Sequence, residues 1–165
     1  MITNDTELID AITKDMAGII DELIEEIHKE LQKKMDDIVY DPNEPSPDGY
    51  QRQGNVGGLR GMFEIDKAHV SGNMISAELK ENSSTLAHDP DHFIHGSNYS
   101  RRGNDIRDVL IEIITEGKSG DFFGEGFWRA KRDFWTPLIK MIEDKKFDKY
   151  IEQGFKSRGI KFKKG

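Results

Sequence analysis

Apolar residues recur at helical spacing through the first forty positions of this 165-residue chain, and no other feature constrains its fold as much. Their mean spacing of 3.75 residues is close to the period of a straight α-helix and above the 3.5 of a left-handed coiled coil. Asn4, with Glu7 three residues later, is typical of an N-cap and its capping box. The pattern predicts one helix over 4–39. Its apolar stripe consists of Leu8, Ile12, Met16, Ile19, Leu23, Ile27, Leu31, Met35 and Ile38.

The length of this helix bears on what it packs against. At 1.5 Å per residue, about 35 residues span roughly 50 Å, and a small domain is not much wider than half of that. We therefore expect part of the stripe, with Leu23, Ile27 and Leu31, to contact a neighbouring subunit. Two alternatives stay open: a break at Gly18 that folds the helix back, or a helix packed only within its own chain.

Residues 40–63, YDPNEPSPDGYQRQGNVGGLRGMF, follow the helix and contain three of the five prolines and five of the sixteen glycines. Proline removes a backbone donor, and glycine weakens regular elements, so this stretch can be neither a helix nor a central strand. We predict a long connection over 40–63.

The remaining chain predicts a small sheet and further helices. Phe63, Ile65, Ile75, Ala77 and Leu79 alternate with polar residues around a turn at 71–73, which predicts an antiparallel hairpin with one buried face. Helical patterns follow over 106–116, from a start at Thr136 and Pro137, and over 147–155 before Gly159. The expected fold is α+β. It is a single domain of a helical arm (1–39), the connection (40–63) and a sheet with C-terminal helices on one face of it (64–165).

Composition and charge exclude several kinds of site and argue against nucleic-acid binding. The chain has no cysteine, which excludes disulfides, thiolate metal sites and a cysteine nucleophile. Residues 1–50 hold 14 acidic against 4 basic residues, whereas 51–165 hold 17 against 20. This polarity suits contacts between subunits better than nucleic-acid binding, which needs a concentrated basic face. The acidic start has no continuous apolar block, so we expect neither a signal peptide nor a membrane span.

The strongest candidate for a metal site is HDPDHFIH, with His88, Asp89, Asp91, His92 and His95. Imidazole and carboxylate ligands suit zinc or manganese, but the proline at position 90 prevents the helix that would align two histidines four residues apart. The chain has no HExxH, G-x-S-x-G or phosphate-binding glycine-lysine motif. We therefore expect no enzyme and no cofactor. A metal-dependent nuclease or hydrolase built on His88–His95 is the alternative function.

Four short motifs stand in a suggestive order: YQRQG (50–54) and GLR (58–60) in the connection, then DVLIEIITEG (108–117) and RDFWTPLI (132–139). This order, after a long amphipathic N-terminal helix, resembles the tail-completion and head-tail joining proteins of long-tailed bacteriophages, often labelled minor capsid or neck proteins. The resemblance implies a structural protein of the virion, assembled in the host cytoplasm, that forms a homo-oligomeric and typically hexameric ring. The implied partners are the tail tube protein and the head connector or stopper proteins, with no membrane.

The resemblance also implies roles for individual residues. It places subunit or tube contacts on the helix and the connection, and a dock for the final helix near its start. An acidic lumen would let DNA pass without specific binding, since phosphates repel carboxylates. A bacterial interaction module that binds an unrelated partner through the same arm is a further alternative. The contact residues expected beyond the helix are Tyr50, Gln51, Arg52, Gly54, Leu59 and Arg60, and the dock residues are Arg132, Phe134, Trp135 and Pro137.

Overall fold

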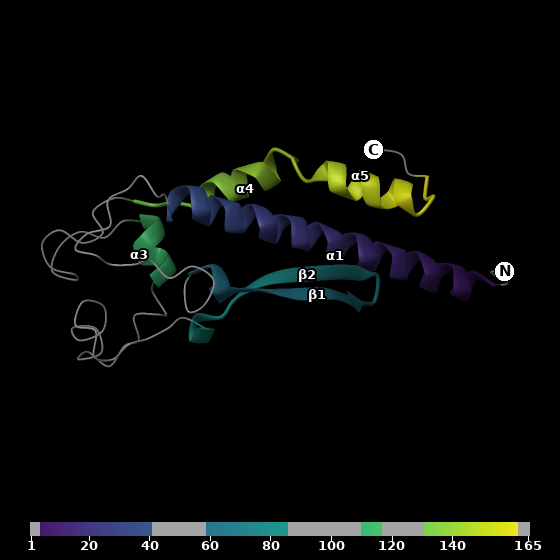
Figure 1. The fold of residues 1–165 in the computed structure, drawn as a ribbon. Helices are drawn as coiled ribbons and strands as arrows, with labels where there is room; N and C mark the ends of the chain where they lie inside the picture. The colour runs from purple at the N-terminus through teal and green to yellow at the C-terminus, as the bar shows by residue number, and fades with distance from the viewer. Residues whose placement is uncertain (1–3, 41–58, 86–109, 117–130, 162–165) are drawn as a thin grey trace, which may run out of the picture. The chain divides into compact units, whose positions relative to one another are not determined.

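The computed structural model describes residues 4–40, 59–85, 110–116 and 131–161. Figure 1 shows the helices and strands along the chain. In chain order these elements are α1 (Asp5–Ile38), η2 (Leu59–Met62), β1 (Phe63–Ser71), β2 (Met74–Glu81), η3 (Ser83–Thr85), α3 (Leu110–Glu116), α4 (Trp135–Glu143) and α5 (Asp148–Ser157). The long helix, the two-stranded antiparallel sheet and the C-terminal helices confirm the predicted α+β class.

Helix α1 follows the sequence pattern closely. It has 34 residues and continues through Gly18 without a break, which removes the folded-back alternative. The Glu7 amide donates to Asn4 Oδ1 at 2.8 Å, so the predicted N-cap is present. Because a cap satisfies an amide that has no partner within the helix, it helps to fix where α1 begins.

Strands β1 and β2 form the predicted hairpin. They are joined through Gly72, which adopts φ of 61°, a left-handed conformation that glycine reaches without the steric cost of a Cβ. The inward positions Ile75, Ala77 and Leu79 alternate with exposed neighbours, as predicted, but they are only half-buried. The hairpin therefore has one covered face, which is only half-buried over β2 because a two-stranded sheet offers little cover of its own.

The chain divides into two compact units. The first, which we call the hairpin unit, comprises Met1–Glu30, Ile65–Lys80 and Lys140–Gly165. The second, which we call the core unit, comprises Leu31–Glu64 and Glu81–Ile139. Each unit is assembled from segments distant in sequence, so each is held by tertiary contacts rather than by chain continuity.

The core unit contains most of the buried apolar side chains among the described residues. They come from the last turns of α1, from η2 and the start of β1, and from α3 and α4. A backbone hydrogen bond joins two of these segments: the Asn82 amide donates to the Met62 carbonyl at 2.7 Å. The buried side chains of this unit are Leu31, Met35, Val39, Leu59, Met62, Phe63, Ile114, Phe134 and Leu138.

In the hairpin unit, α1 contacts both the hairpin and α5. The Asp21 carboxylate accepts the Ala68 amide of β1 at 2.7 Å, which uses a backbone donor that the two-stranded sheet leaves free. On α5, Gly154 lies so close to Ile19 that a Cβ built on the glycine would be 2.8 Å from Ile19 Cγ1. Glycine at this position therefore permits the two helices to approach closely.

Helices α3, α4 and α5 are all present where the sequence predicts helix. The described part of the predicted 106–116 helix is α3, and positions 106–109 lie outside the described residues. Helix α5 ends before Gly159, which adopts φ of 69°, as a helix C-terminus commonly requires.

The start of α4 differs from the sequence prediction of Thr136 as N-cap and Pro137 as first helical residue. The Asp133 carboxylate accepts both the Thr136 amide, at 2.9 Å, and the Thr136 hydroxyl, at 2.6 Å. Helix α4 accordingly begins at Trp135. Asp133 is the capping side chain, and Pro137 lies in the first turn, where its missing N–H is tolerated.

Candidate functional site

The predicted contact residues of α1 differ in their exposure. Leu23 and Ile27 are half-buried, whereas Leu31 is completely buried among the residues of the core unit. Leu31 therefore stabilises this chain's own core in the structure described. The contact role of Leu23 and Ile27 stays a prediction.

The predicted contact loop is described only at its end. Tyr50, Gln51, Arg52 and Gly54 lie outside the described residues. Leu59 and Arg60 form part of η2, where Leu59 is buried.

Arg60 and the end of α1 form a compact polar and aromatic cluster. The Arg60 guanidinium pairs with Asp36 and lies 5.3 Å from the centre of the Tyr40 ring. The Leu59 amide donates to the Tyr40 hydroxyl at 2.9 Å, and Gln32 Nε2 donates to the Arg60 carbonyl at 3.0 Å. These four interactions attach the end of the connection to the end of α1. They position Arg60, since a cation over an aromatic face and beside a carboxylate is held in one orientation.

The predicted dock of the final helix is an aromatic cluster in the core unit. Phe134 is completely buried, stacks on Trp135 with ring centres 5.7 Å apart, and meets Phe63 edge-on at 6.3 Å. Phe63 and Trp135 are also edge-on, at 5.4 Å. The Arg132 amide donates to the Ile114 carbonyl at 2.9 Å and so joins this segment to α3. Such aromatic pairs add about 0.5–1.5 kcal/mol to the stability gained by burial alone.

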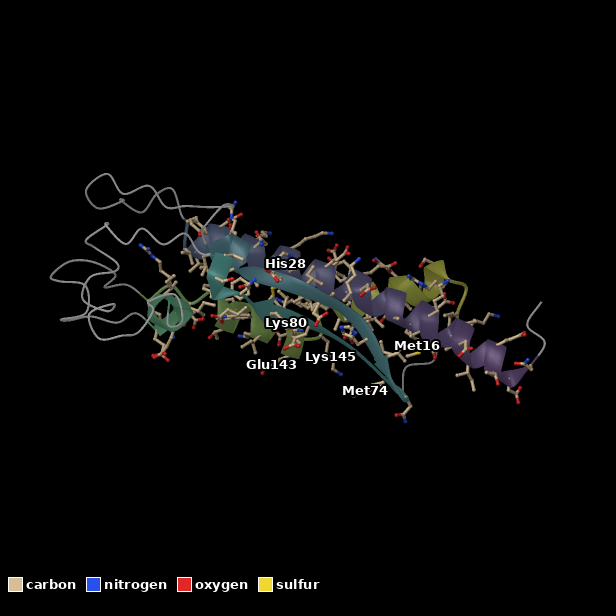
Figure 2. The ribbon with its side chains drawn as sticks, turned by 90° about the horizontal axis from the view of Figure 1, so that it is seen from below. Met16, His28, Met74, Lys80, Glu143 and Lys145 are labelled. Carbon is tan, nitrogen blue, oxygen red and sulfur yellow. The ribbon has the colours of Figure 1, made fainter. Side chains whose placement is uncertain are left out.

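Most of the exposed large apolar side chains among the described residues lie elsewhere, in the hairpin unit. Sequence reasoning placed Leu8, Ile12 and Met16 in the apolar stripe but did not single out this end of α1 as the exposed part. Figure 2 labels Met16 on α1 and Met74 at the turn end of the hairpin. The exposed fractions are 44% for Leu8, 62% for Ile9, 43% for Ile12, 39% for Met16, 51% for Val70 and 61% for Met74. Contiguous exposed apolar side chains mark a protein interaction site more often than isolated ones do.

Acidic residues surround the exposed part of α1. Four carboxylates and a single lysine, Lys14, lie within residues 5–16. Every one of these charged side chains is exposed or half-buried. The carboxylates belong to Asp5, Glu7, Asp10 and Asp15.

Three titratable side chains of the hairpin, those of Asp66, His69 and Lys80, interact with one another. Asp66 accepts a hydrogen bond from Lys80 and has His69 Nε2 within 2.9 Å of Oδ1. These two interactions, that of Lys80 first, hold the pKa of Asp66 below its usual value. All three side chains lie on the surface, so they lack the enclosed environment that general acid–base catalysis uses.

The alternative metal site cannot be placed, since His88, Asp89, Asp91, His92 and His95 lie outside the described residues. Among the residues that the structure describes, no three His, Cys, Asp or Glu side chains gather as a metal site requires. Within the same ranges, no helix combines the length and the apolar character needed to cross a bilayer.

The candidate site among the described residues is thus an exposed apolar surface on the first turns of α1, with acidic side chains around it. Comparison with known proteins adds no relative to this description. Neither the family models, nor the curated proteins, nor the solved structures contain a match to this chain.

Proposed function

We propose that this chain is a structural subunit that assembles with copies of itself into a closed ring at the neck of a long-tailed bacteriophage. There it would complete the tail and join it to the head. The observation that supports assembly is the concentration of exposed apolar side chains on the hairpin unit. Exposing them in a free monomer is unfavourable, because burying the exposed half of such a side chain would contribute roughly half of the about 1.5–3 kcal/mol that full burial gives.

The described chemistry favours a binding role over catalysis. Polar contacts such as those of Arg60 with Asp36 and Asp133 with Thr136 link one structural element to another or cap a helix. Each of these groups already has a structural partner. A subunit of a large assembly needs rigid elements and exposed apolar surface, and the described residues provide both.

The identity of the assembly rests on the sequence motifs. GLR and RDFWTPLI resemble those of tail-completion proteins, and the structure places Leu59 and Arg60 of the first and Phe134 of the second in packed positions of the core unit. Under this proposal the partners are the tail tube protein and the head connector or stopper proteins. DNA passes through the ring without specific binding, because an acidic surface repels phosphates.

Assembly is tested first with the purified full-length chain. Light scattering coupled to size-exclusion chromatography, over a wide concentration range, should give a mass of several times the 18.9 kDa of one chain. Electron microscopy of the same fraction should show closed rings of uniform diameter, since a repeated contact between two different faces closes when its rotation divides a full turn. Open filaments or a broad range of sizes would contradict the closed ring.

The place of the ring is tested in a phage that carries this gene. Interrupting the gene should leave DNA-filled heads and separate tails in the lysate, and supplying the wild-type chain from a plasmid should restore joined particles. Complete, infectious particles from the interrupted phage would overturn the proposed function.

A further inference from the structure

The exposed start of α1 continues a line of residues that α5 covers farther along the same helix. Positions spaced by three and four residues lie on one face of a helix. On this line α5 meets Ile19 through Gly154, and Arg158 Nη2 donates to Glu22 Oε1 at 2.8 Å. The line consists of Leu8, Ile12, Asp15, Ile19 and Glu22. Its first two residues are exposed, so the cover that α5 provides ends before the first turns of α1.

The cover ends there because the chain turns at Gly159. The Gly159 amide donates to the Lys156 carbonyl at 3.1 Å, and the Ile160 amide donates to the Phe155 carbonyl at 2.9 Å. With the positive φ of Gly159, these bonds form the Schellman motif that commonly ends a helix. The chain after the turn therefore leaves the line that α5 follows along α1.

The uncovered surface is apolar and surrounded by negative charge. Asp5 precedes two of its apolar residues by three and four positions, so its carboxylate lies on the same face of α1. Lys14 is the single basic residue among the four acidic residues of 5–16. We call this surface the acidic patch: Leu8, Ile9, Ile12 and Met16, with Asp5, Glu7, Asp10 and Asp15 around them. An occupant must offer apolar side chains and positive charge.

Two surfaces of a second copy do not meet this requirement. Placing two acidic patches face to face brings eight carboxylates together with only two lysines, and like charges disfavour such a contact. The junction of α4 and α5 has no net charge to offer, since residues 142–149 hold three lysines and three acidic residues.

The segment that follows the turn at Gly159 does meet the requirement. We call residues 160–164, IKFKK, the basic segment: it holds two apolar residues and three lysines. Residues 153–165 contain five basic residues and no acidic one, so no acidic neighbour in sequence offsets these lysines. Ile160 is half-buried and Lys161 is exposed, and positions 162–164 lie outside the described residues.

We propose that the basic segment of one copy binds the acidic patch of a second copy of this chain. This inference rests on the proposed function and names one contact through which the ring would form. Because the turn at Gly159 takes the segment off the line of its own α1, the contact is made between copies. The two surfaces are different, so the contact is head-to-tail and closes into a ring when the geometry permits.

The size of the contact sets its strength. A segment of five residues buries little area, at the low end of the range for protein interfaces, so two isolated copies should bind weakly. Closing a ring makes the last contact intramolecular and strengthens the whole assembly. Ile160 and Phe162 supply affinity by apolar burial, and the lysines orient the segment and speed its encounter with the acidic patch. Salt should therefore slow association, since it screens exposed charges.

The test reverses the charge on each side of the contact in the full-length chain. Lys161→Glu with Lys163→Glu reverses the basic segment, and Asp5→Lys with Asp10→Lys reverses the acidic patch. A further chain carries all four substitutions. Ile12→Glu damages the same patch without a change in the first turn of α1, where lysine is unfavourable to the helix dipole.

The matched control makes the same change of charge elsewhere in the hairpin unit. Lys140→Glu with Lys146→Glu replaces two exposed lysines that lie outside the acidic patch and the basic segment. Circular dichroism and thermal melting check that every variant folds.

Analytical ultracentrifugation at low salt measures assembly. Each chain with one reversed surface should have a dissociation constant at least about tenfold higher than that of the wild type, because like charges then face each other. The chain with all four substitutions should return to within about threefold of the wild type, because opposite charges face each other again. The control should assemble as the wild type does.

Three outcomes would overturn the inference: a wild-type chain that stays monomeric, a reversed basic segment that assembles as well as the control, or a four-substitution chain as weak as the chains with one reversed surface. Its failure is distinguishable from failure of the proposed function. Rings that survive both reversals leave the ring in place and remove only this contact. Joined particles from the gene-interrupted phage remove the function whatever the ultracentrifuge shows.

Discussion

The two units of the chain differ in how many of their apolar side chains are buried. Of the twelve buried apolar side chains among the described residues, nine belong to the core unit and three to the hairpin unit. Of the eight large apolar side chains that are exposed within the described ranges, seven belong to the hairpin unit. Since α1 contributes to both units, the same helix is anchored in a core at one end and presents apolar side chains at the other.

The buried residues of the core unit stabilise the fold, whereas the exposed apolar residues of the hairpin unit remain accessible on the surface. The core unit is stabilised by aromatic packing around Phe134 and by the contacts of Arg60 with Asp36 and Tyr40. The hairpin unit is held by a few specific interactions, the close approach of Gly154 to Ile19, the Asp21 carboxylate on β1 and the ion pair of Glu22 with Arg158. A unit held in this way can keep its shape while leaving apolar residues free to bind a partner.

Two leucines at opposite ends of α1 should differ most in their contribution to stability. Leu31 is completely buried, and Leu8 is 44% exposed. Leu31→Ala should lower the free energy of unfolding by about 2–5 kcal/mol, because it removes packed atoms and leaves a cavity. Leu8→Ala should change it by less than about 0.5 kcal/mol. Urea denaturation of dilute protein measures both, and equal losses would show that the two ends of α1 do not differ.

Gly154 tests the close contact between α5 and α1 within the hairpin unit. A Cβ at Gly154 would lie 2.8 Å from Ile19 Cγ1 and 3.0 Å from Cγ2, atoms of a buried, β-branched side chain that has little room to move. Gly154→Ala should therefore destabilise the chain by about 1–3 kcal/mol through overpacking. Thermal unfolding followed by circular dichroism should show a lower Tm.

Gly18→Ala is the matched control for that substitution. Its Cβ would also meet an atom at 2.8 Å, but that atom is Nη2 of Arg158, at the end of a long flexible side chain. Because the side chain can move and alanine favours helix over glycine by up to about 1 kcal/mol, Gly18→Ala should be neutral or stabilising. An equal loss at both glycines would contradict a specific helix contact at Gly154.

The cap of α4 tests the core unit with a smaller effect. Asp133 accepts two hydrogen bonds from Thr136, so Asp133→Ala should destabilise by about 0.5–2 kcal/mol. Asp133→Asn keeps an acceptor oxygen and should lose less. Burial raises the pKa of Asp133, but the bonds from Thr136 and Lys131 outweigh it and lower the pKa overall. A loss as large for asparagine as for alanine would argue against the cap, as judged by urea denaturation.

The smallest expected effect concerns Glu22, which pairs with Arg158 at 2.8 Å. The hydrogen bond from Arg158 lowers the pKa of Glu22 below its ordinary value of 4.5. The pair therefore contributes stability above pH 4.5, and this contribution is lost as the pH falls through the lowered pKa. Because Glu22 is 58% exposed, Glu22→Gln should cost only about 0.2–1 kcal/mol at neutral pH.

Denaturation of wild type and Glu22→Gln across a pH series checks that sign. The difference between them should shrink below pH 4.5 and also when salt is raised at neutral pH. A difference that grows on acidification would mean that Arg158 does not stabilise the ionised carboxylate.

Much of the local structure could be predicted from the sequence. The 3.75-residue spacing and the Asn4 cap define α1 almost to the residue, and a glycine at the turn defines the hairpin. The predicted start of α4 was wrong by two positions, Pro137 instead of Trp135, because Asp133 and Thr136 are both good capping residues and only the fold shows which one bonds. The contacts of Tyr40 with Leu59 and Arg60 were not predicted, since no local pattern links residues so far apart.

The contact role of the apolar stripe stays a prediction, and the sequence did not show which part of the stripe is exposed in the folded chain. The sequence indicated a stripe longer than one small domain could cover, and we expected contacts at Leu23, Ile27 and Leu31. The structure buries Leu31 and exposes Leu8, Ile9, Ile12 and Met16 at the other end of the same stripe. Periodicity could not separate these ends, because it reports which face of a helix is apolar and not which length of that face is covered.

The helices and strands of this protein, their order and the division into an acidic start and a more basic remainder follow from local sequence. Those properties depend on neighbouring residues, through backbone hydrogen bonds, caps and side-chain spacing. The tertiary structure alone decided which end of α1 enters a core, where Gly154 permits close approach and which apolar residues remain exposed. Those properties depend on contacts between distant segments, whose partners are chosen by shape and packing once the chain has folded.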